Sequence, residues 1–235
     1  MFDFHKNTQK KHSTLFHNGL SANTILSVEN LHVKFGNIEA LKNVDFKLSR
    51  GEIVFLTGVS GAGKTTLLKA LCGIQEITKG KLKRSQNSFI SPIFQDLKLL
   101  QNKTIKQNLE LVYDTQVYAT RKEFDSELMD FAQYLGFDNR LNILLKDANG
   151  GLKQKVAFVR ALLAKPDIIL ADEPTAALDY ENAKRMFDIL NILNVRKGLT
   201  VLWATHNREL VKKFTGRMVH IDKGKLIYSG HACFI

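Results

Sequence analysis

Cysteine, proline and long apolar runs are scarce in this sequence. Its 235 residues include two cysteines, three prolines and one tryptophan. Cys72 and Cys233 show no metal-ligand spacing, and we expect Cys72 to be packed and reduced. No apolar run approaches the about 18 residues that cross a bilayer, and the start of the chain lacks the apolar stretch of a secretory signal. We therefore expect a protein that stays in the cytoplasm unless a partner holds it at a membrane.

Acidic residues are also in deficit. Lys and Arg number 34 against 23 Asp and Glu, which gives a formal net charge of +11. This balance suits an acidic partner such as a nucleotide, a nucleic acid or an anionic lipid surface, and it equally suits charge that only maintains solubility. The sequence has neither zinc-finger spacing nor an RNP-like aromatic motif, so no nucleic-acid partner is expected.

The hydrophobic pattern divides the chain into segments. Residues 1–24 are polar, include His5, His12 and His17 without a metal-site spacing, and predict a flexible N-terminal tail. Alternating apolar residues then predict antiparallel strands over residues 26–35 and 44–48. Apolar residues at steps of three and four, with no proline, predict a helical insert over about 104–148. Further strands are expected at 53–56, 168–170 and 200–204, helices at 66–71, 152–163 and 181–196, and a hairpin at 218–228. This alternation indicates an α/β fold with a mainly parallel sheet and helices on both faces, in one domain over residues 25–235.

The most specific motif is a phosphate-binding loop between a predicted strand and a predicted helix. The segment reads Gly58-Val59-Ser60-Gly61-Ala62-Gly63-Lys64-Thr65, and it fits G-x-x-x-x-G-K-[ST] at every fixed position. Backbone N–H groups of such a loop cradle phosphate oxygens, the lysine reaches the β- and γ-phosphates, and the threonine hydroxyl binds Mg²⁺. We therefore expect ATP to bind at residues 58–66, with Thr66 in the first turn of the helix.

Two adjacent carboxylates follow a second buried strand. The segment Ile168-Ile169-Leu170-Ala171 ends in Asp172 and Glu173. A carboxylate at a strand end beside a phosphate loop suits contact with Mg²⁺, which predicts that role for Asp172. Glu173 is placed to polarise a water for in-line attack on the γ-phosphate. The two motifs together predict a nucleotide triphosphatase.

Five further features make the chain resemble the ABC-type ATPases over about residues 26–228. Asn149-Gly150-Gly151 precedes a helix as in that family's signature motif, Pro174 to Asp179 is similar to its D-loop, and Ala204-Thr205-His206 is similar to its switch-histidine segment. Gln95 matches its Q-loop, and Phe35 lies where the family stacks an aromatic ring on adenine. The resemblance implies the ABC ATPase fold, with an antiparallel β subdomain and a helical subdomain at about 104–148.

The resemblance also implies roles for individual residues. Two ATP molecules lie between two copies of such a domain, and the signature segment of one copy contacts the ATP bound by the other. Catalytic roles fall to Glu173, His206 and Gln95, and Mg²⁺ contacts to Thr65, Gln95 and Asp172. Asp179 belongs to the D-loop. The implied assembly is an ATP-dependent homodimer held on the cytoplasmic side of the membrane by an integral membrane partner.

Within the family, two segments are similar to the cell-division subfamily FtsE: residues 54–69 and Phe94-Gln95-Asp96-Leu97-Lys98-Leu99-Leu100. This implies a partner like the membrane protein FtsX. Two alternatives remain open at this stage. One is the ATPase of a lipoprotein-release or efflux transporter. The other is an ATP-gated scaffold with little hydrolysis, because Asn149 replaces the signature serine and Leu152 the signature glutamine.

Overall fold

The computed structural model describes residues 20–207, 211 and 213–231. The expectations for His5, His12, His17 and Cys233, and for residues 1–19 of the tail, therefore concern residues outside the described part. Of the predicted tail, residues 20–23 precede the first strand, and Thr24 already belongs to it. None of the described helices is long and apolar enough to cross a membrane.

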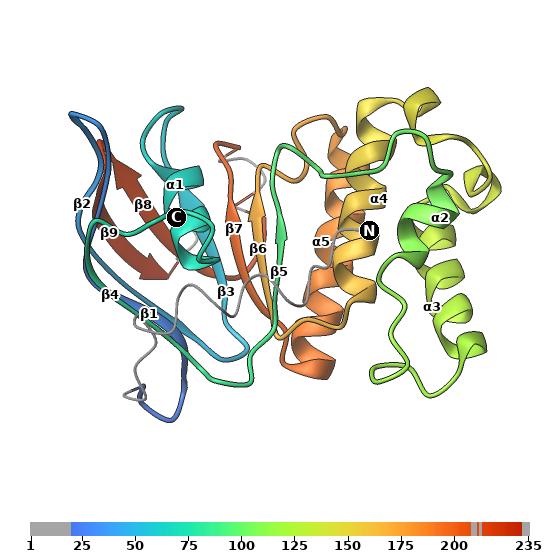
Figure 1. The fold of residues 1–235 in the computed structure, drawn as a ribbon, viewed down its shortest axis with the longest axis horizontal. Coiled ribbons are helices and arrows are strands. Elements are labelled where there is room, and N and C mark those ends of the chain that lie inside the picture. Colours follow the sequence, from blue (N-terminus) through green and yellow to red (C-terminus); the bar gives the residue numbers. More distant parts are fainter. Residues whose placement is uncertain (1–19, 208–210, 212, 232–235) are drawn as a thin grey trace.

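A six-stranded sheet forms the centre of the molecule (Figure 1). Its strand order is β5-β6-β7-β3-β8-β9. All neighbours are parallel except the last pair, in which β9 runs antiparallel to β8. The predicted parallel sheet and C-terminal hairpin are thus confirmed. The strands are β3 (Ile53–Thr57), β5 (Ile90–Ile93), β6 (Ile168–Asp172), β7 (Thr200–Ala204), β8 (Arg217–Asp222) and β9 (Lys225–His231).

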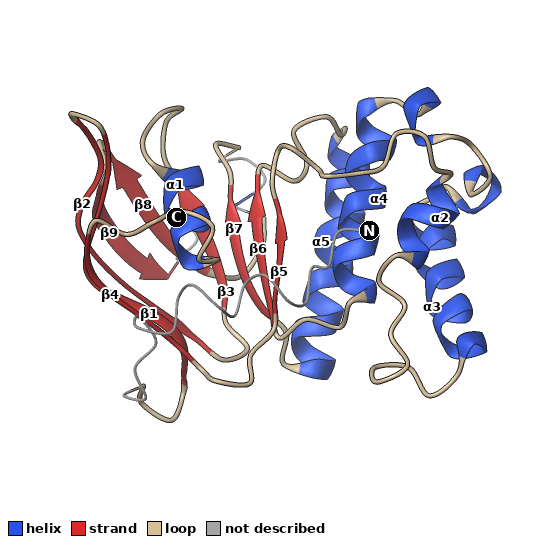
Figure 2. Cartoon of the chain, viewed as in Figure 1, coloured by secondary structure: helices blue, strands red, loops and turns tan. Residues whose placement is uncertain are grey.

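Both faces of the central strands are covered, which explains their continuous apolar character. Every residue of β3, β6 and β7 is buried. Along β3, Ile53 and Phe55 belong to the core beneath the helices, whereas Val54 and Leu56 belong to a second core on the other face. Figure 2 shows the large helices on one side of this sheet and α1 with the remaining strands on the other.

The second core lies between the six-stranded sheet and a three-stranded antiparallel sheet. That sheet has the order β2-β1-β4, and α1 packs with it. Along β2 the inward residues alternate with more exposed ones, as in a half-buried strand, whereas residues 25–28 of the central strand β1 are all buried. The elements are β1 (Thr24–Phe35), β2 (Ile38–Ser49), α1 (Lys64–Leu71) and β4 (Lys79–Arg84).

The helical side is built from α4, α5 and an insert between β5 and α4. The insert contains α2 (Ile105–Glu110), α3 (Arg121–Tyr134) and the short 3₁₀ helices η1 (Asp138–Arg140) and η2 (Leu145–Asp147). Both α2 and α3 begin at a threonine whose hydroxyl accepts from the third residue of the helix, Thr104 and Thr120. The larger helices are α4 (Gly150–Leu163) and α5 (Tyr180–Lys197). Gly198, at a left-handed φ of 67°, ends α5 as expected.

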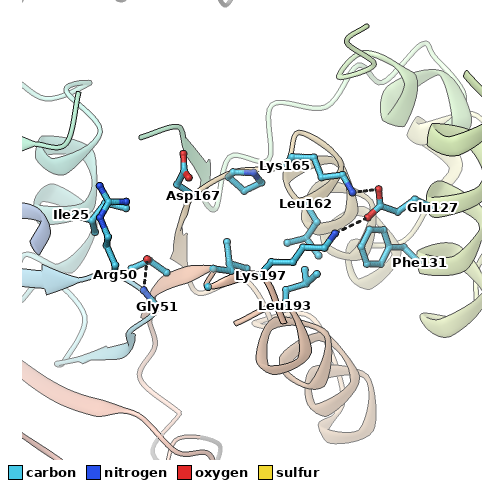
Figure 3. A pocket seen from close by; sticks show the side chains of 14 residues that line it. Ile25, Arg50, Gly51, Glu127, Phe131, Leu162, Lys165, Asp167, Leu193 and Lys197 are labelled. Atoms are coloured by element: carbon cyan, nitrogen blue, oxygen red, sulfur yellow. Dashed lines mark hydrogen bonds and ion pairs between the residues drawn. The ribbon is translucent and has the colours of Figure 1, made fainter. Parts of the chain in front are cut away.

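A cavity of about 370 Å³ lies at the amino-end edge of the sheet, where β3, β6 and β7 begin (Figure 3). Glu127 of α3 forms ion pairs there with Lys165, which follows α4, and with Lys197 at the end of α5. Tyr118 donates its hydroxyl proton to the same carboxylate and to the carbonyl of Leu163. This network fastens the helical insert to the core.

The sequence pattern did not predict β4 and β5. The β4 segment reads Lys-Gly-Lys-Leu-Lys-Arg, with only one apolar residue, and β5 contains Pro92. Both strands lie at a sheet edge, where proline is tolerated because the outward N–H of an edge strand has no ladder partner. Cys72 is a free thiol whose burial raises its pKa to about 12, in agreement with the expectation of a packed, reduced residue.

Candidate active site

The phosphate loop occupies the turn between β3 and α1. Gly58 has to be glycine because a Cβ there would lie 2.3 Å from the carbonyl oxygen of Ile221. Gly63 takes a φ of 110° directly before α1, and a Cβ at this residue would lie 3.0 Å from the carbonyl oxygen of Ala40. The N-cap residue of α1, Gly63, has no side chain with which to cap the helix. The N–H groups of the first turn are therefore available to a phosphate group bound in the loop.

Lys64 is held inside the loop. Its ammonium group donates to the carbonyls of Gly58 at 2.7 Å and Val59 at 3.2 Å, and it lies 3.8 Å from Glu173 Oε1. The side chain is only 9% exposed. An ammonium group has three N–H donors, and the two loop carbonyls use two of them, so one donor remains for a phosphate oxygen.

Thr65 and Asp172 meet at the carboxyl edge of the sheet. The Thr65 hydroxyl donates to Asp172 Oδ2 at 2.6 Å. Asp172 is buried. In the described part of the chain, its Oδ1 is one of only two buried side-chain nitrogen or oxygen atoms without a hydrogen-bond partner. Burial raises the pKa of Asp172, the neighbouring Glu173 adds to this effect, and the Thr65 hydroxyl opposes it. A carboxylate oxygen that is buried and unpaired, beside a hydroxyl, fits the oxygen ligands that Mg²⁺ prefers.

Gln95 lies at the same edge. It follows β5 by two residues, and Ile93 of β5 pairs with Ala171, the residue before Asp172. Its side chain is exposed, so its amide oxygen is available as a further ligand. The structure thus places Gln95 and Asp172 at the ends of the neighbouring strands β5 and β6, with Thr65 in the first turn of α1 bonded to Asp172.

The side chains of Glu173 and His206 form a hydrogen-bonded pair. His206 Nδ1 lies 2.8 Å from Glu173 Oε1, and the Glu173 backbone N–H donates to the carbonyl of Ala204 at the end of β7. Glu173 has a left-handed φ of 50°, a conformation that costs a non-glycine residue about 1 kcal/mol or more. The strain turns the carboxylate out of the strand direction toward Lys64. Such strain at a functional position was not visible in the sequence.

The signature segment begins α4. Asn149 is the N-cap, and its side-chain oxygen accepts from the Leu152 N–H at 2.8 Å. Gly150 and Gly151 form the first turn, as expected, and Leu152 is buried. With Asn149, these residues line a cavity of about 450 Å³. The side-chain oxygen of Asn149 thus caps the helix, while the NH₂ group of the same side chain stays available as a donor.

The D-loop lies against the signature segment of the same chain. A Cβ on Gly151 would lie 2.9 Å from the Ala177 carbonyl oxygen, and Gln154 accepts a hydrogen bond from the Ala177 N–H at 2.9 Å. Asp179 is the N-cap of α5 and binds Asn182 through both carboxylate oxygens. These bonds lower the pKa of Asp179, the Asn182 backbone N–H having the largest effect. Gln154 is a residue that sequence reasoning missed, because one glutamine on a helix gives no signal.

Phe35 lies at the β1–β2 turn. The turn pairs Phe35 with Ile38, and both side chains are exposed, at 48% and 72%. An exposed aromatic ring at a hairpin tip has no packing role of its own and offers a surface for stacking. The structure therefore leaves Phe35 available for the predicted contact with adenine.

Taken together, a phosphate loop before α1, a buried carboxylate beside the loop threonine and a glutamate–histidine pair define a P-loop nucleotide hydrolase. The sequence profile of the family "ABC transporter" matches residues 41–176. The chain belongs to the ABC transporter ATPase family, and it is an ATPase that uses ATP with Mg²⁺.

Three curated relatives illustrate the range of similar proteins. The methionine import ATP-binding protein MetN of Clostridioides difficile is 30% identical over 220 residues, which cover 88% of this chain and 68% of MetN. The phosphonates import ATP-binding protein PhnC of Lactobacillus delbrueckii is 33% identical, over 81% of this chain and 82% of PhnC. The cell division ATP-binding protein FtsE of Mycobacterium tuberculosis is 32% identical, over 80% of this chain and 87% of FtsE. These identities are too similar to separate import from cell division.

Solved structures confirm the fold class. The dimeric structure of the bacterial ABC transporter cassette MJ0796 superimposes with a TM-score of 0.80 at 27% identity, over 90% of this chain and 100% of that chain. The dimeric post-hydrolysis state of MJ0796 with ADP and Pi gives a TM-score of 0.78 with the same coverage. The ABC ATPase fold expected from the motifs is therefore confirmed.

Proposed function

We propose that this chain is the ATP-hydrolysing subunit of an FtsE-type complex, in which an FtsX-like membrane protein transmits ATP-driven closure across the cytoplasmic membrane to regulate septal peptidoglycan hydrolysis. The observation that carries the ATP-driven part is the unpaired Oδ1 of Asp172 beside Thr65 and the phosphate loop. The FtsE assignment is supported by the segments 54–69 and 94–100 and by the FtsE relative.

The residues of one site divide the work of hydrolysis. The α1 amides and Lys64 bind the phosphates, and Thr65, Asp172 and Gln95 would hold Mg²⁺, which when bound neutralises charge on the phosphate oxygens. His206 and Lys64 both contact Oε1 of Glu173, and among the described residues no partner is found for Oε2. Oε2 is therefore the atom that accepts the proton of the attacking water.

The signature segment acts in the second site of a homodimer. The phosphate loop and α1 pack on one face of the six-stranded sheet, whereas α4 packs on the other (Figure 1). Asn149, Gly150 and Gly151 therefore present the α4 N-terminus, with the N–H groups of its two glycines, to a phosphate bound by another copy. The MJ0796 cassette is dimeric in both solved structures, which supports a homodimer for this chain.

Capture of the native complex tests the proposal. We would purify the tagged chain from detergent-solubilised membranes with ATP present and identify what accompanies it. Lys64→Ala is the control, because it is expected to abolish ATP binding, and an unchanged nucleotide affinity would contradict the assignment of the site. An FtsX-like protein with septal components supports the proposal. An import permease would move the function to transport, as the MetN and PhnC relatives suggest, and no membrane partner would overturn it.

A further inference from the structure

Arg160 connects the signature helix to the segment that follows Gln95. It lies on α4, ten residues after Gly150, and thus about 15 Å along the axis from the start of the helix. Its Nη2 donates to the carbonyl of Leu97 at 2.8 Å and its Nη1 to the carbonyl of Lys98 at 2.9 Å. The guanidinium group thus binds the carbonyls of two consecutive residues, and the first of these, Leu97, lies two residues after Gln95.

The contact is specific because the guanidinium group is half-buried and both of its terminal nitrogens are used by these carbonyls. Burial lowers the pKa of Arg160, although an arginine stays protonated in a protein. Among the described residues, no carboxylate pairs with it. The two carbonyls are therefore what stabilises this charge, and its burial is costly if they move away. Lys98 adopts a left-handed φ of 49°, which turns both carbonyls toward the helix.

The other end of the same segment is fixed by Asn108 of α2. This side chain is fully buried. Its oxygen accepts from the Leu100 N–H at 2.8 Å, and its NH₂ group donates to the carbonyls of Leu100 and Thr104, both at 3.0 Å. Residues 97–104 are thus bonded to both α4 and α2, and the continuous helix α4 links the contact at Arg160 to the signature segment at its start.

We propose that Arg160 is a positioning residue that couples the two ATP sites of the dimer. Through it, Gln95 engaged at the Mg²⁺ of one site fixes the direction in which α4 presents Gly150 and Gly151 to the other site. The inference deepens the proposed function and rests on it. Arg160 itself touches neither nucleotide nor metal, so its loss is expected to alter cooperativity rather than ATP affinity.

Steady-state ATP turnover of the purified chain, measured against ATP and Mg²⁺ concentration, tests the coupling. The variants are Arg160→Met, which removes the charge and both bonds, and Arg160→Lys, which keeps the charge but reaches one carbonyl. Tyr118→Phe is the matched control. It removes a buried hydrogen bond between the insert and the carbonyl of Leu163, which lies about one turn beyond Arg160 at the same end of α4, without touching residues 95–104.

For Arg160→Met we expect kcat to fall about 10- to 100-fold, because a small misplacement of reacting groups has effects of this size. The Hill coefficient for ATP is expected to fall from about 2 toward 1, the change that loss of coupling between two sites predicts. ATP binding without Mg²⁺ should stay within about twofold of the unmodified chain, Arg160→Lys should be intermediate, and Tyr118→Phe should keep the Hill coefficient.

Two results overturn the inference. Either Arg160→Met retains the Hill coefficient of the unmodified chain, or Tyr118→Phe loses it to the same extent. In both cases cooperative turnover by the unmodified chain would still support the dimeric ATPase cycle of the proposed function, which capture of the membrane partner tests separately. If the unmodified chain turns over ATP without cooperativity, no coupling exists for Arg160 to carry, and the dimeric mechanism fails with it.

Discussion

The six-stranded sheet has a carboxyl edge, where its parallel strands end, and an amino edge, where they begin, and the two differ in whether their polar groups are satisfied. At the carboxyl edge, Asp172 keeps a buried oxygen without a partner, Glu173 holds a strained backbone and Lys64 donates to loop carbonyls. At the amino edge, Glu127 satisfies its charge with Lys165 and Lys197 (Figure 3). The first edge is complete only when a metal and an anion are added, whereas the second is complete in the chain itself.

Helix direction reinforces this difference. The carboxyl edge receives the N-terminus of α1, whose partial positive charge favours an anion. The amino edge receives the C-terminal ends of α4 and α5, whose partial negative charge favours cations, and Lys165 and Lys197 lie there. The cavity of about 370 Å³ at the amino edge therefore has a structural role, although it is similar in size to the cavity of about 450 Å³ at the signature segment, which we call the signature cavity. Unsatisfied groups and dipole direction, more than cavity volume, therefore mark the functional edge.

The largest effect should come from the catalytic carboxylate. Glu173→Gln removes the acceptor for the proton of water but keeps the size of the side chain, so we expect turnover to fall about 100- to 10,000-fold. ATP binding should persist, and an ATP-bound dimer should accumulate. ATP hydrolysis, equilibrium nucleotide binding and size-exclusion chromatography with ATP measure the three effects. Normal turnover would remove Glu173 from the catalytic role.

Asp172 and Asp167 allow a matched test, because they lie at the two ends of β6. Asp172→Asn should raise the Mg²⁺ concentration needed for turnover about tenfold or more, since it weakens an expected metal contact. Asp167 accepts from the Phe89 N–H at 2.7 Å, and Asp167→Asn should leave the Mg²⁺ requirement unchanged. Equal effects of the two variants on the Mg²⁺ requirement would contradict the proposed division between the edges.

The pH dependence of stability gives a second test of Asp172. Since burial raises the pKa of Asp172, the folded state without ligand holds this proton more tightly than the unfolded chain. Asp172 therefore lowers stability progressively as pH rises from the unfolded-state pKa, about 3.9, through the raised folded value. Chemical denaturation without nucleotide should show this loss in the unmodified chain and not in Asp172→Asn, which should be equally or more stable at pH 7.

Glu127→Gln should act on stability alone. It removes both ion pairs but keeps an acceptor for the Tyr118 hydroxyl, so we expect a loss of about 1–2 kcal/mol in the free energy of unfolding. ATP affinity should stay within about twofold of the unmodified chain, because no residue at the carboxyl edge is touched. Urea denaturation and nucleotide titration check the two halves of this prediction. A large loss of ATP affinity with little loss of stability would assign a functional role to the amino edge.

The sequence revealed the elements whose formation depends on local pattern. Buried strands such as Ile53–Thr57 and the helix ended by Gly198 were predictable, because apolar runs and a C-terminal glycine are local signals. The strand Lys79–Arg84 was not, because its pairing with β1 depends on a partner over 40 residues away. Pro92 concealed β5 for a similar reason, since only the finished sheet shows that this strand is at an edge.

The candidate site divides in the same way. Lys64, Thr65, Asp172 and Glu173 were predictable because phosphate and Mg²⁺ chemistry requires those side chains next to strand ends. The residues that hold the surrounding loops were not predictable. Arg160, Asn108 and Gln154 each bond to the backbone of another segment, and only the folded chain brings that segment close. Side chain-to-backbone bonds of this kind leave no pattern in a single sequence, because any carbonyl can accept and its position is set by the fold.

Asn149→Ser should have the smallest effect and tests the signature segment itself. Serine caps a helix about as well as asparagine, so stability should change by less than about 0.5 kcal/mol. The Oγ of serine would take over the bond from the Leu152 N–H, while its shorter side chain would leave more room at the start of α4 for a phosphate of the second copy. We therefore expect turnover to stay equal or to rise. ATP hydrolysis beside urea denaturation measures both quantities. A large loss of turnover at unchanged stability would mean that the Asn149 NH₂ group contacts the nucleotide in a way that a hydroxyl cannot replace, and the signature cavity would then be specific for this chain's asparagine.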